Sequence, residues 1–122
     1  MDTDVYQGMF INLLTKNRNN SILRFMEINI PIKYRQDIEN ATKLLKNEGC
    51  KAVFLFGSLV TGKMHDNSDI DIGIKGYPTG KFFRLYSRLF FDFDNKIDLV
   101  DFDTNEDLYL ILNKIGEVVQ IG

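Results

Sequence analysis

Residues 68–75 alternate strictly between polar and apolar side chains, and this alternation constrains the fold more than any other feature. The order Asp69, Ile70, Asp71, Ile72 has the two-residue period of a β-strand. Side chains two positions apart on a strand point to the same side, so the two aspartates share one face. The segment therefore predicts a strand with one apolar face and one face that carries two carboxylates.

The remaining segments predict a small sheet with helices packed on it. Two apolar runs, 51–56 and 96–102, are typical of strands, and residues 117–121 can add a closing strand. Helical spacing of apolar residues marks four further segments: 5–15, 31–49, 81–93 and 104–115. Residues 21–30 fit either a short helix or a strand. We therefore expect an α+β (mixed α/β) fold, with a mixed sheet of about four strands.

Finer expectations concern the helix ends and faces. Gly49 and Gly116 are the predicted C-terminal stops of two helices, and Thr104 is the predicted N-cap of the last helix. In the aromatic helix 81–93, one side is expected to hold Phe82, Tyr86, Leu89 and Phe93. This helix is apolar on more than one face, so one face can pack in the core and another is a candidate interface with a partner.

Composition narrows the classes of protein that the chain can belong to. The 122 residues suit one domain. A net charge of −2 and a pI near 5.3 argue against broad affinity for nucleic acid, although a local basic patch stays open. The single cysteine, Cys50, excludes an internal disulfide framework and is predicted to be a buried thiol. Because the sequence has no apolar run of membrane-spanning length and no signal peptide, we expect a cytoplasmic protein without a membrane partner.

The paired aspartates predict a divalent metal site. Two carboxylates held close together repel unless a cation or a proton lies between them, and Asp is depleted in strands. Mg²⁺ commonly takes one or two carboxylates together with substrate phosphates. Just upstream, Gly57 allows the backbone to approach an anion, and Ser58 offers a hydroxyl and an N–H. The alternative is a pair of aspartates exposed on an edge strand.

A third carboxylate, Asp98, lies on the next predicted strand. If that strand neighbours the one carrying Asp69 and Asp71, the three side chains can form one cluster. Asp101 and Asp103 are rival candidates, but Asp101 should point away from Asp98, and both fit loop or cap positions. His65, the only histidine, could touch a phosphate, although a solvated loop position explains it better.

Residues 57–63 also approach the P-loop pattern G-x-x-x-x-G-K. A P-loop lysine is followed by Ser or Thr, whose hydroxyl binds magnesium, and position 64 is Met. A P-loop also leads into a helix whose N-terminus faces the phosphates, whereas Lys63 is followed by turn residues and a strand. We therefore reject the P-loop interpretation.

Gly57-Ser58, ten residues and then Asp69-x-Asp71 resembles the signature of the DNA polymerase β-like nucleotidyltransferase superfamily. The chain is most similar to its minimal nucleotidyltransferase (MNT) domains over residues 34–121. The resemblance makes 1–30 an N-terminal helical extension and 31–122 the minimal nucleotidyltransferase domain. Many relatives carry arginine where Thr61 stands, and Lys63 could supply part of that missing charge.

The resemblance implies Mg²⁺-dependent nucleotidyl transfer, most simply of AMP from ATP, to a hydroxyl. By analogy, Asp69 and Asp71 hold two Mg²⁺ ions, while Asp98 holds the catalytic ion and helps to deprotonate the acceptor. Gly57, Ser58 and Lys63 then contact the nucleoside triphosphate. Such reactions depend mainly on positioning and charge stabilisation.

The resemblance also implies a partner. Minimal nucleotidyltransferases are often paired with a HEPN-domain toxin and act as its antitoxin, in some cases by adding AMP to a tyrosine. Two alternatives stay open: a small-molecule enzyme of the aminoglycoside-modifying type, which would work as a homo-oligomer, and a non-catalytic module that binds its partner. Elongation of nucleic acid is not expected, because the chain is acidic and has no room for a template-binding domain.

Overall fold

The computed structural model describes residues 30–122 of the chain. The expected helix at residues 5–15 and nearly all of the ambiguous segment 21–30 lie outside the described residues. Within residues 30–122 the elements follow one another in this order: α3 (Ile32–Asn47), β1 (Ala52–Phe56), α4 (Ser58–Thr61), β2 (Ile70–Lys75), α5 (Phe82–Phe91), β3 (Ile97–Asp101), α6 (Glu106–Ile115) and β4 (Val118–Gln120).

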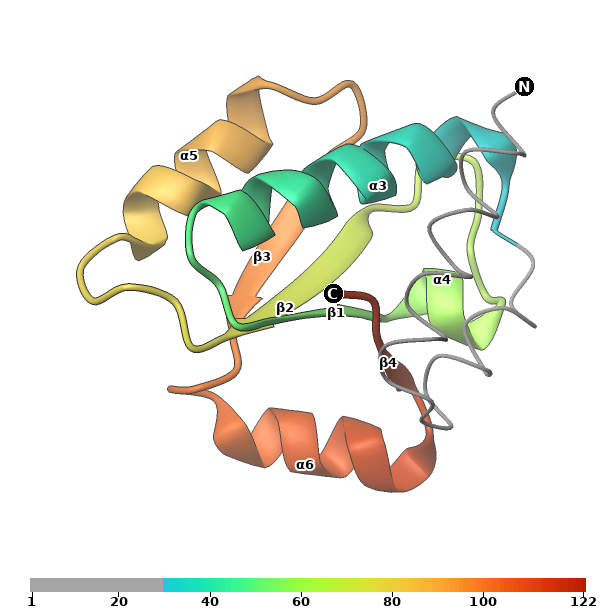
Figure 1. The fold of residues 1–122 in the computed structure, drawn as a ribbon. Coiled ribbons are helices and arrows are strands. Elements are labelled where there is room, and N and C mark those ends of the chain that lie inside the picture. The colour runs from blue at the N-terminus through green and yellow to red at the C-terminus, as the bar shows by residue number, and fades with distance from the viewer. Residues whose placement is uncertain (1–29) are drawn as a thin grey trace.

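The described strands form one mixed sheet in the order β3-β2-β1-β4 (Figure 1). β1 pairs antiparallel with both β2 and β4, while β2 and β3 run parallel. A parallel pair needs a crossover connection, which α5 supplies. The expected α+β fold class with a four-stranded mixed sheet is therefore confirmed, and the first two strands are antiparallel neighbours.

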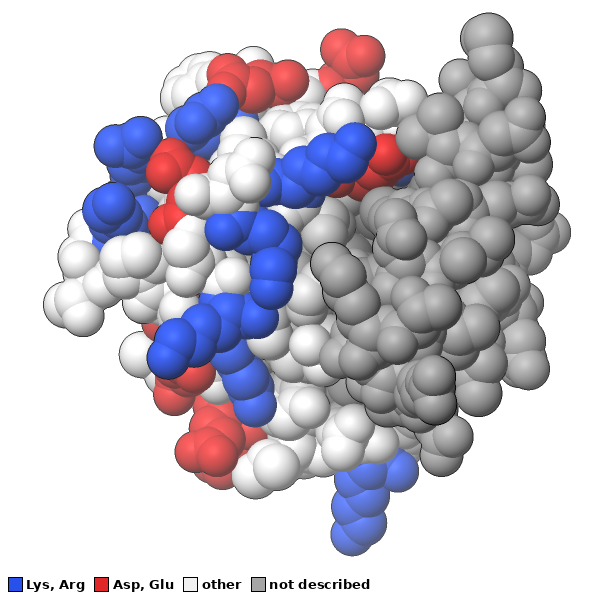
Figure 2. Space-filling model, in the orientation of Figure 1, with Lys and Arg blue, Asp and Glu red and all other residues white. Residues whose placement is uncertain are grey.

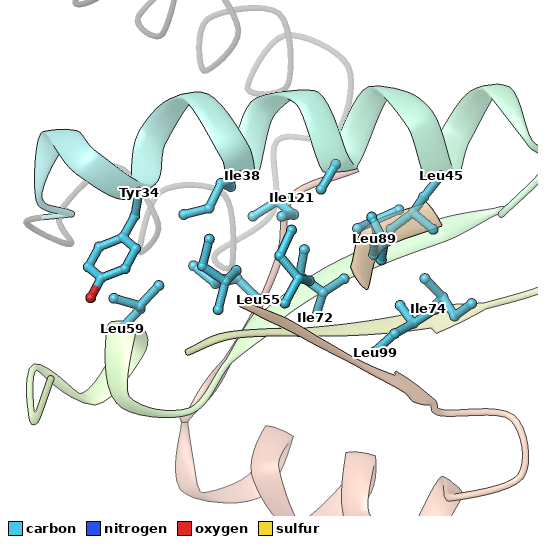
Figure 3. Packing of buried hydrophobic residues seen from close by; sticks show 14 of the residues in the cluster. Tyr34, Ile38, Leu45, Leu55, Leu59, Ile72, Ile74, Leu89, Leu99 and Ile121 are labelled. Atoms are coloured by element: carbon cyan, nitrogen blue, oxygen red, sulfur yellow. The ribbon is translucent and has the colours of Figure 1, made fainter. Parts of the chain in front are cut away.

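The main core lies between the sheet and the helices α3 and α5, which cover the same face (Figures 1 and 3). Ile70, Ile72 and Ile74 of β2 are fully buried in it, as the alternation predicts. Leu85 and Leu89 of α5 are equally buried. Apolar burial on this scale is the principal source of stability in a domain of this size.

A smaller cluster occupies the other face of the sheet, beneath α6. It is formed by Phe54, Phe102 and Val118, with Tyr109 of α6 packed on them. Gly73 of β2 faces this cluster, and a Cβ built there would lie 2.1 Å from the Phe102 ring. The glycine interrupts the polar positions of β2 because the phenyl ring takes the space that a side chain would need.

Cys50 is buried, as predicted, at the turn between α3 and β1. Burial raises the pKa of its thiol to about 11, although the nearby Lys46 opposes this shift. At neutral pH the thiol is therefore protonated, which suits a packing residue and not a nucleophile.

In α5 the fully buried residues are Leu85 and Leu89; of the residues expected on one side, Phe82 and Phe93 also pack against the core, and Tyr86 is 39% exposed. Two local predictions need correction. Thr104 does not cap α6: the helix begins at Glu106, and its N-cap residue, Asn105, makes no capping hydrogen bond through its side chain. The turn before α6 is instead held by Asp101, which accepts hydrogen bonds from nearby backbone N–H groups. β2 begins at Ile70, so Asp69 immediately precedes the strand.

Lys and Arg side chains form a band across the surface that contains α3 and α5 (Figure 2). The exposed Lys46 belongs to the C-terminal half of α3, and its ammonium group donates to the carbonyl of Lys51, just before β1. The acidic net charge of the chain did not exclude a local basic patch of this kind. Separately, no helix in the described part of the chain is long and apolar enough to cross a membrane.

Candidate active site

The parallel pairing of β2 and β3 brings two predicted site residues together. Asp71 of β2 and Asp98 of β3 are partners in the register. Asp71 lies two residues before Gly73, which faces the Phe102 ring, so both carboxylates belong to the α6 face of the sheet. The structure therefore places two like charges side by side, an arrangement that costs stability unless something compensates it.

Asp69 joins this pair from the loop that leads into β2. Its backbone neighbour Ile70 is fixed to the chain before β3, because the Ile70 N–H donates to the Lys96 carbonyl at 2.9 Å. The Asp69 and Asp98 side chains are 34% and 41% exposed, respectively, so both remain open to solvent and to a ligand. All three predicted carboxylates thus lie at one end of β2 and β3.

Lys96 is a site residue that the sequence reasoning did not select. Its ammonium nitrogen lies 3.4 Å from Asp69 Oδ2 and 4.0 Å from Asp98 Oδ1. The two carboxylates raise the pKa of Lys96, with Asp98 the larger influence, so the side chain is charged. The signal was present in the sequence, because Lys96 stands two residues before Asp98 and strand periodicity puts both on the same face.

Asp71 is the carboxyl most affected by these surroundings. Its pKa is raised to about 6, first by burial, then by the negative charges of Asp98 and Asp69, while Lys96 lowers it in part. The group therefore holds a proton far more readily than an ordinary aspartate. A cation bound between these carboxylates would remove the cause of the repulsion.

Gly57 explains why the chain can turn so close to the carboxylates. It follows β1 with φ of 79°, in the left-handed region, and a Cβ built on it would lie 2.1 Å from Asp71 Oδ2. Any other residue would be strained and would collide with that oxygen. Ser58 then opens the short helix α4, in which the Val60 and Thr61 N–H groups donate to the Gly57 carbonyl. The glycine-serine turn and Asp71 are thus in direct contact.

The loop after α4 contains the remaining candidates, Thr61, Lys63 and His65. Lys63 is exposed, and its backbone N–H donates to Thr61 Oγ1 at 3.4 Å. His65 is also exposed, and its Nδ1 accepts a hydrogen bond from the Asn67 N–H, as fits a surface loop residue. No helix follows Lys63 before β2, which agrees with the rejection of the P-loop interpretation.

Asp101 and Asp103 have structural roles at the far end of β3. Asp101 is buried and accepts hydrogen bonds from the Tyr77 hydroxyl and from the Asp103 and Thr104 N–H groups. Burial would raise the pKa of Asp101, but these donors outweigh it and lower the pKa. Asp103 accepts from the Gly76 N–H at 2.8 Å. Neither residue joins Asp98, which therefore has no rival from this strand.

The donor chemistry of the site suits a hard divalent cation, because carboxylate oxygens are the ligands that Mg²⁺ prefers. A side chain at position 57 would occupy the space next to Asp71 Oδ2, and the glycine leaves that space free. Among residues 30–122, however, no three acidic, histidine or cysteine side chains converge as a preformed metal cage. The ammonium of Lys96 contacts two of the three carboxylates instead. The residues therefore fit Mg²⁺ by type and proximity, and binding requires their side chains to rearrange.

Comparison with known proteins places the chain in a family. The family model "Polymerase beta, Nucleotidyltransferase" matches residues 36–121, which is more than half of the chain. No curated protein matches significantly. A solved structure described as "Crystal structure of the toxin-antitoxin with AMP-PNP" is similar, with 29% identity, a TM-score of 0.55, and coverage of 69% of this chain and 72% of that chain. The chain belongs to the polymerase β-type nucleotidyltransferase family.

Proposed function

We propose that this protein transfers a nucleotidyl group, most simply AMP from ATP, to a hydroxyl acceptor in a Mg²⁺-dependent reaction. The observation that carries the proposal is the contact of Gly57 with Asp71, which is itself in register with Asp98. This arrangement puts an anion-accepting turn directly beside paired carboxylates. Phosphates and metal ions together need both of these features.

Each candidate residue has a distinct role in the proposed reaction. Asp69, Asp71 and Asp98 would hold Mg²⁺, and Gly57, Ser58 and Lys63 would hold the triphosphate. Bound Mg²⁺ would supply charge neutralisation and stabilise the attacking and leaving oxygens. Asp98, whose side chain is 41% exposed, would accept the proton of the acceptor hydroxyl. That oxygen bonds to the α-phosphorus, the bond to the bridging oxygen breaks, and pyrophosphate leaves.

For the acceptor we propose a tyrosine of a HEPN-type toxin, with this chain as the antitoxin. Two observations support a protein acceptor. The similar solved structure is described as a toxin–antitoxin with AMP-PNP. In addition, α5 exposes a set of aromatic side chains: Phe83, Tyr86, Phe90 and Phe91. Exposed aromatic side chains gathered on one helix are typical of protein-binding surfaces.

The test is an adenylylation assay with Mg²⁺ and α-labelled ATP, with and without the protein encoded beside this one. We expect label on the partner with the wild type and none with Asp69→Asn/Asp71→Asn. The matched control is Asp94→Asn/Asp107→Asn, which removes the same charge from exposed positions outside the site. This control should label the partner at the wild-type rate.

Other results identify the alternatives. Label on small alcohols or aminoglycosides without any protein partner would show that the acceptor is a small molecule and not a toxin. Tight partner binding by wild type and double variant alike, with no label in either, would contradict catalysis and favour a binding module. Equal labelling by wild type and Asp69→Asn/Asp71→Asn would overturn the assignment of the site.

A further inference from the structure

Lys96 has a position that the proposed chemistry leaves unexplained. It immediately precedes β3, and its carbonyl accepts the Ile70 N–H, so its backbone is fixed beside the start of β2. Ile70 and Ile97 are register partners, which makes Asp69 and Lys96 the next pair outward along the same parallel ladder. Lys96 and Asp98, two residues apart, share one face. Its side chain is therefore directed to the carboxylates by the sheet itself.

The contacts of the ammonium group resemble those of a metal ion. It lies within 4.0 Å of carboxylate oxygens on both Asp69 and Asp98. These are two of the three acids that would hold Mg²⁺ under the proposed function. A monovalent ammonium and a divalent cation cannot both make close contacts with the same oxygens, because each needs the same lone pairs and the two cations repel each other.

We propose that Lys96 is the built-in counter-ion of the carboxylate site, which divalent metal must displace from Asp69 and Asp98. This inference rests on the proposed function, since it takes these carboxylates to be the metal ligands. Lys96 offsets the repulsion among the acids when no metal is bound, and it lowers the affinity for metal alone. Once displaced, its exposed ammonium is free to meet the added negative charge of a nucleotide.

The experiment measures binding of Mn²⁺ alone to the full-length protein, by the electron paramagnetic resonance signal of the free ion. We compare wild type with Lys96→Met, which keeps most of the side-chain length and removes the charge, and with Lys96→Arg, which keeps the charge. Lys96→Met should bind Mn²⁺ about two- to fivefold more tightly, the change expected from losing a solvent-exposed ion pair. Lys96→Arg should differ from wild type by less than about twofold.

Lys51→Met is the matched control, because Lys51 is exposed beside the opposite end of β2, where its N–H donates to the Lys75 carbonyl. It removes the same charge from the protein and should leave the affinity for Mn²⁺ unchanged. A second readout follows displacement directly: the side-chain ¹⁵N resonance of Lys96 should shift when Mg²⁺ is added, and that of Lys51 should not.

The possible failures can be told apart. If Lys96→Met binds Mn²⁺ no more tightly than wild type while Asp69→Asn/Asp71→Asn loses binding, the metal site stands and the counter-ion role is overturned. If Lys96→Met gains affinity no more than Lys51→Met does, general charge accounts for the effect and the proposal is again overturned. If the double Asp→Asn variant binds Mn²⁺ like wild type, the metal assignment fails and the role of Lys96 fails with it.

Discussion

At the scale of single residues, the free-energy cost of bringing the carboxylates together falls mainly on Asp71. Burial and the neighbouring Asp98 and Asp69 raise the pKa of this group to about 6, against 3.8 for an ordinary aspartate. The folded protein therefore binds this proton more tightly than the unfolded chain does. The contribution of this group to stability is fully present below pH 3.8, and it is lost as the pH rises from about 3.8 through about 6.

This linkage predicts the effect of Asp71→Asn on the metal-free protein. Asparagine cannot ionise, so the variant avoids the cost that the wild type bears at neutral pH. We expect Asp71→Asn to be more stable than wild type by about 1–2 kcal/mol at pH 7.5, a figure reduced for solvent screening of a half-buried group. The difference should shrink towards zero near pH 3.5. Urea unfolding without metal at both pH values measures it.

Asp107→Asn is the control for this measurement, because Asp107 is exposed on α6. It should change stability by less than about 0.5 kcal/mol at either pH. A wild type that is more stable than Asp71→Asn at pH 7.5 would show that the carboxylate is satisfied in the metal-free fold and that our account of its pKa is wrong.

At Gly57, the backbone conformation and the neighbouring Asp71 side chain together restrict which residue can stand there. We predict that Gly57→Ala loses about 2–4 kcal/mol of stability, because the added Cβ is strained at positive φ and also meets Asp71 Oδ2. Gly80→Ala is a close control: φ is 80° there, yet nothing lies within 4 Å of the added Cβ. It should lose only about 1–2 kcal/mol from backbone strain. Equal losses in thermal or urea unfolding would exclude the steric contribution.

At the scale of elements, α5 serves two purposes with its two sides. Leu85 and Leu89 are buried against the sheet, whereas Phe83 and Phe91 are 81% and 77% exposed. The sequence showed that the helix is apolar on more than one face, but it did not indicate which face is buried. Apolar residues all around a helix leave its rotation undetermined, and contact with β3 settles it.

The exposed side of α5 yields a prediction about partner binding. Phe83→Ser/Phe90→Ser should weaken the complex with the adjacent-encoded protein by about tenfold or more, because aromatic side chains that become buried on binding contribute most of the affinity of such surfaces. The fold should survive, since both side chains are more than half exposed. Isothermal titration calorimetry measures the affinity, and circular dichroism checks the fold.

The control for α5 lies on α6, which also exposes apolar side chains. Leu110→Ser/Ile111→Ser removes two of them, with 53% and 58% exposure. Unchanged affinity in this control together with a loss in the α5 variant would locate the docking surface. A loss in the α6 variant alone would move the surface to the other face of the sheet.

At the scale of the whole molecule, the site exists because two connections with different geometry end at the same place. β1 returns antiparallel into β2, so the Gly57 turn comes beside the start of β2, where Asp71 pairs with Phe56. The α5 crossover then makes β3 parallel to β2, which brings Asp98 to the same end.

The sequence by itself determined the periodic elements and the fold class, and it singled out the carboxylates that we propose as metal ligands. Strand alternation placed Asp69 and Asp71 on one face, and the buried isoleucines confirm the other face. These features are local, because backbone geometry repeats every two residues in a strand and an apolar face must be buried wherever the strand goes.

Only the tertiary structure decided the register of Asp98 with Asp71, the contact of Gly57 with Asp71, and the contact of Lys96 with Asp69. Each of these depends on which strands are neighbours and in which direction they run, and no local pattern encodes that. The capping prediction at Thr104 was wrong for a local reason, because Asp101, three residues earlier, accepts the Thr104 N–H and α6 begins only at Glu106. Local periodicity specifies which face a side chain occupies, while long-range packing specifies what it meets there.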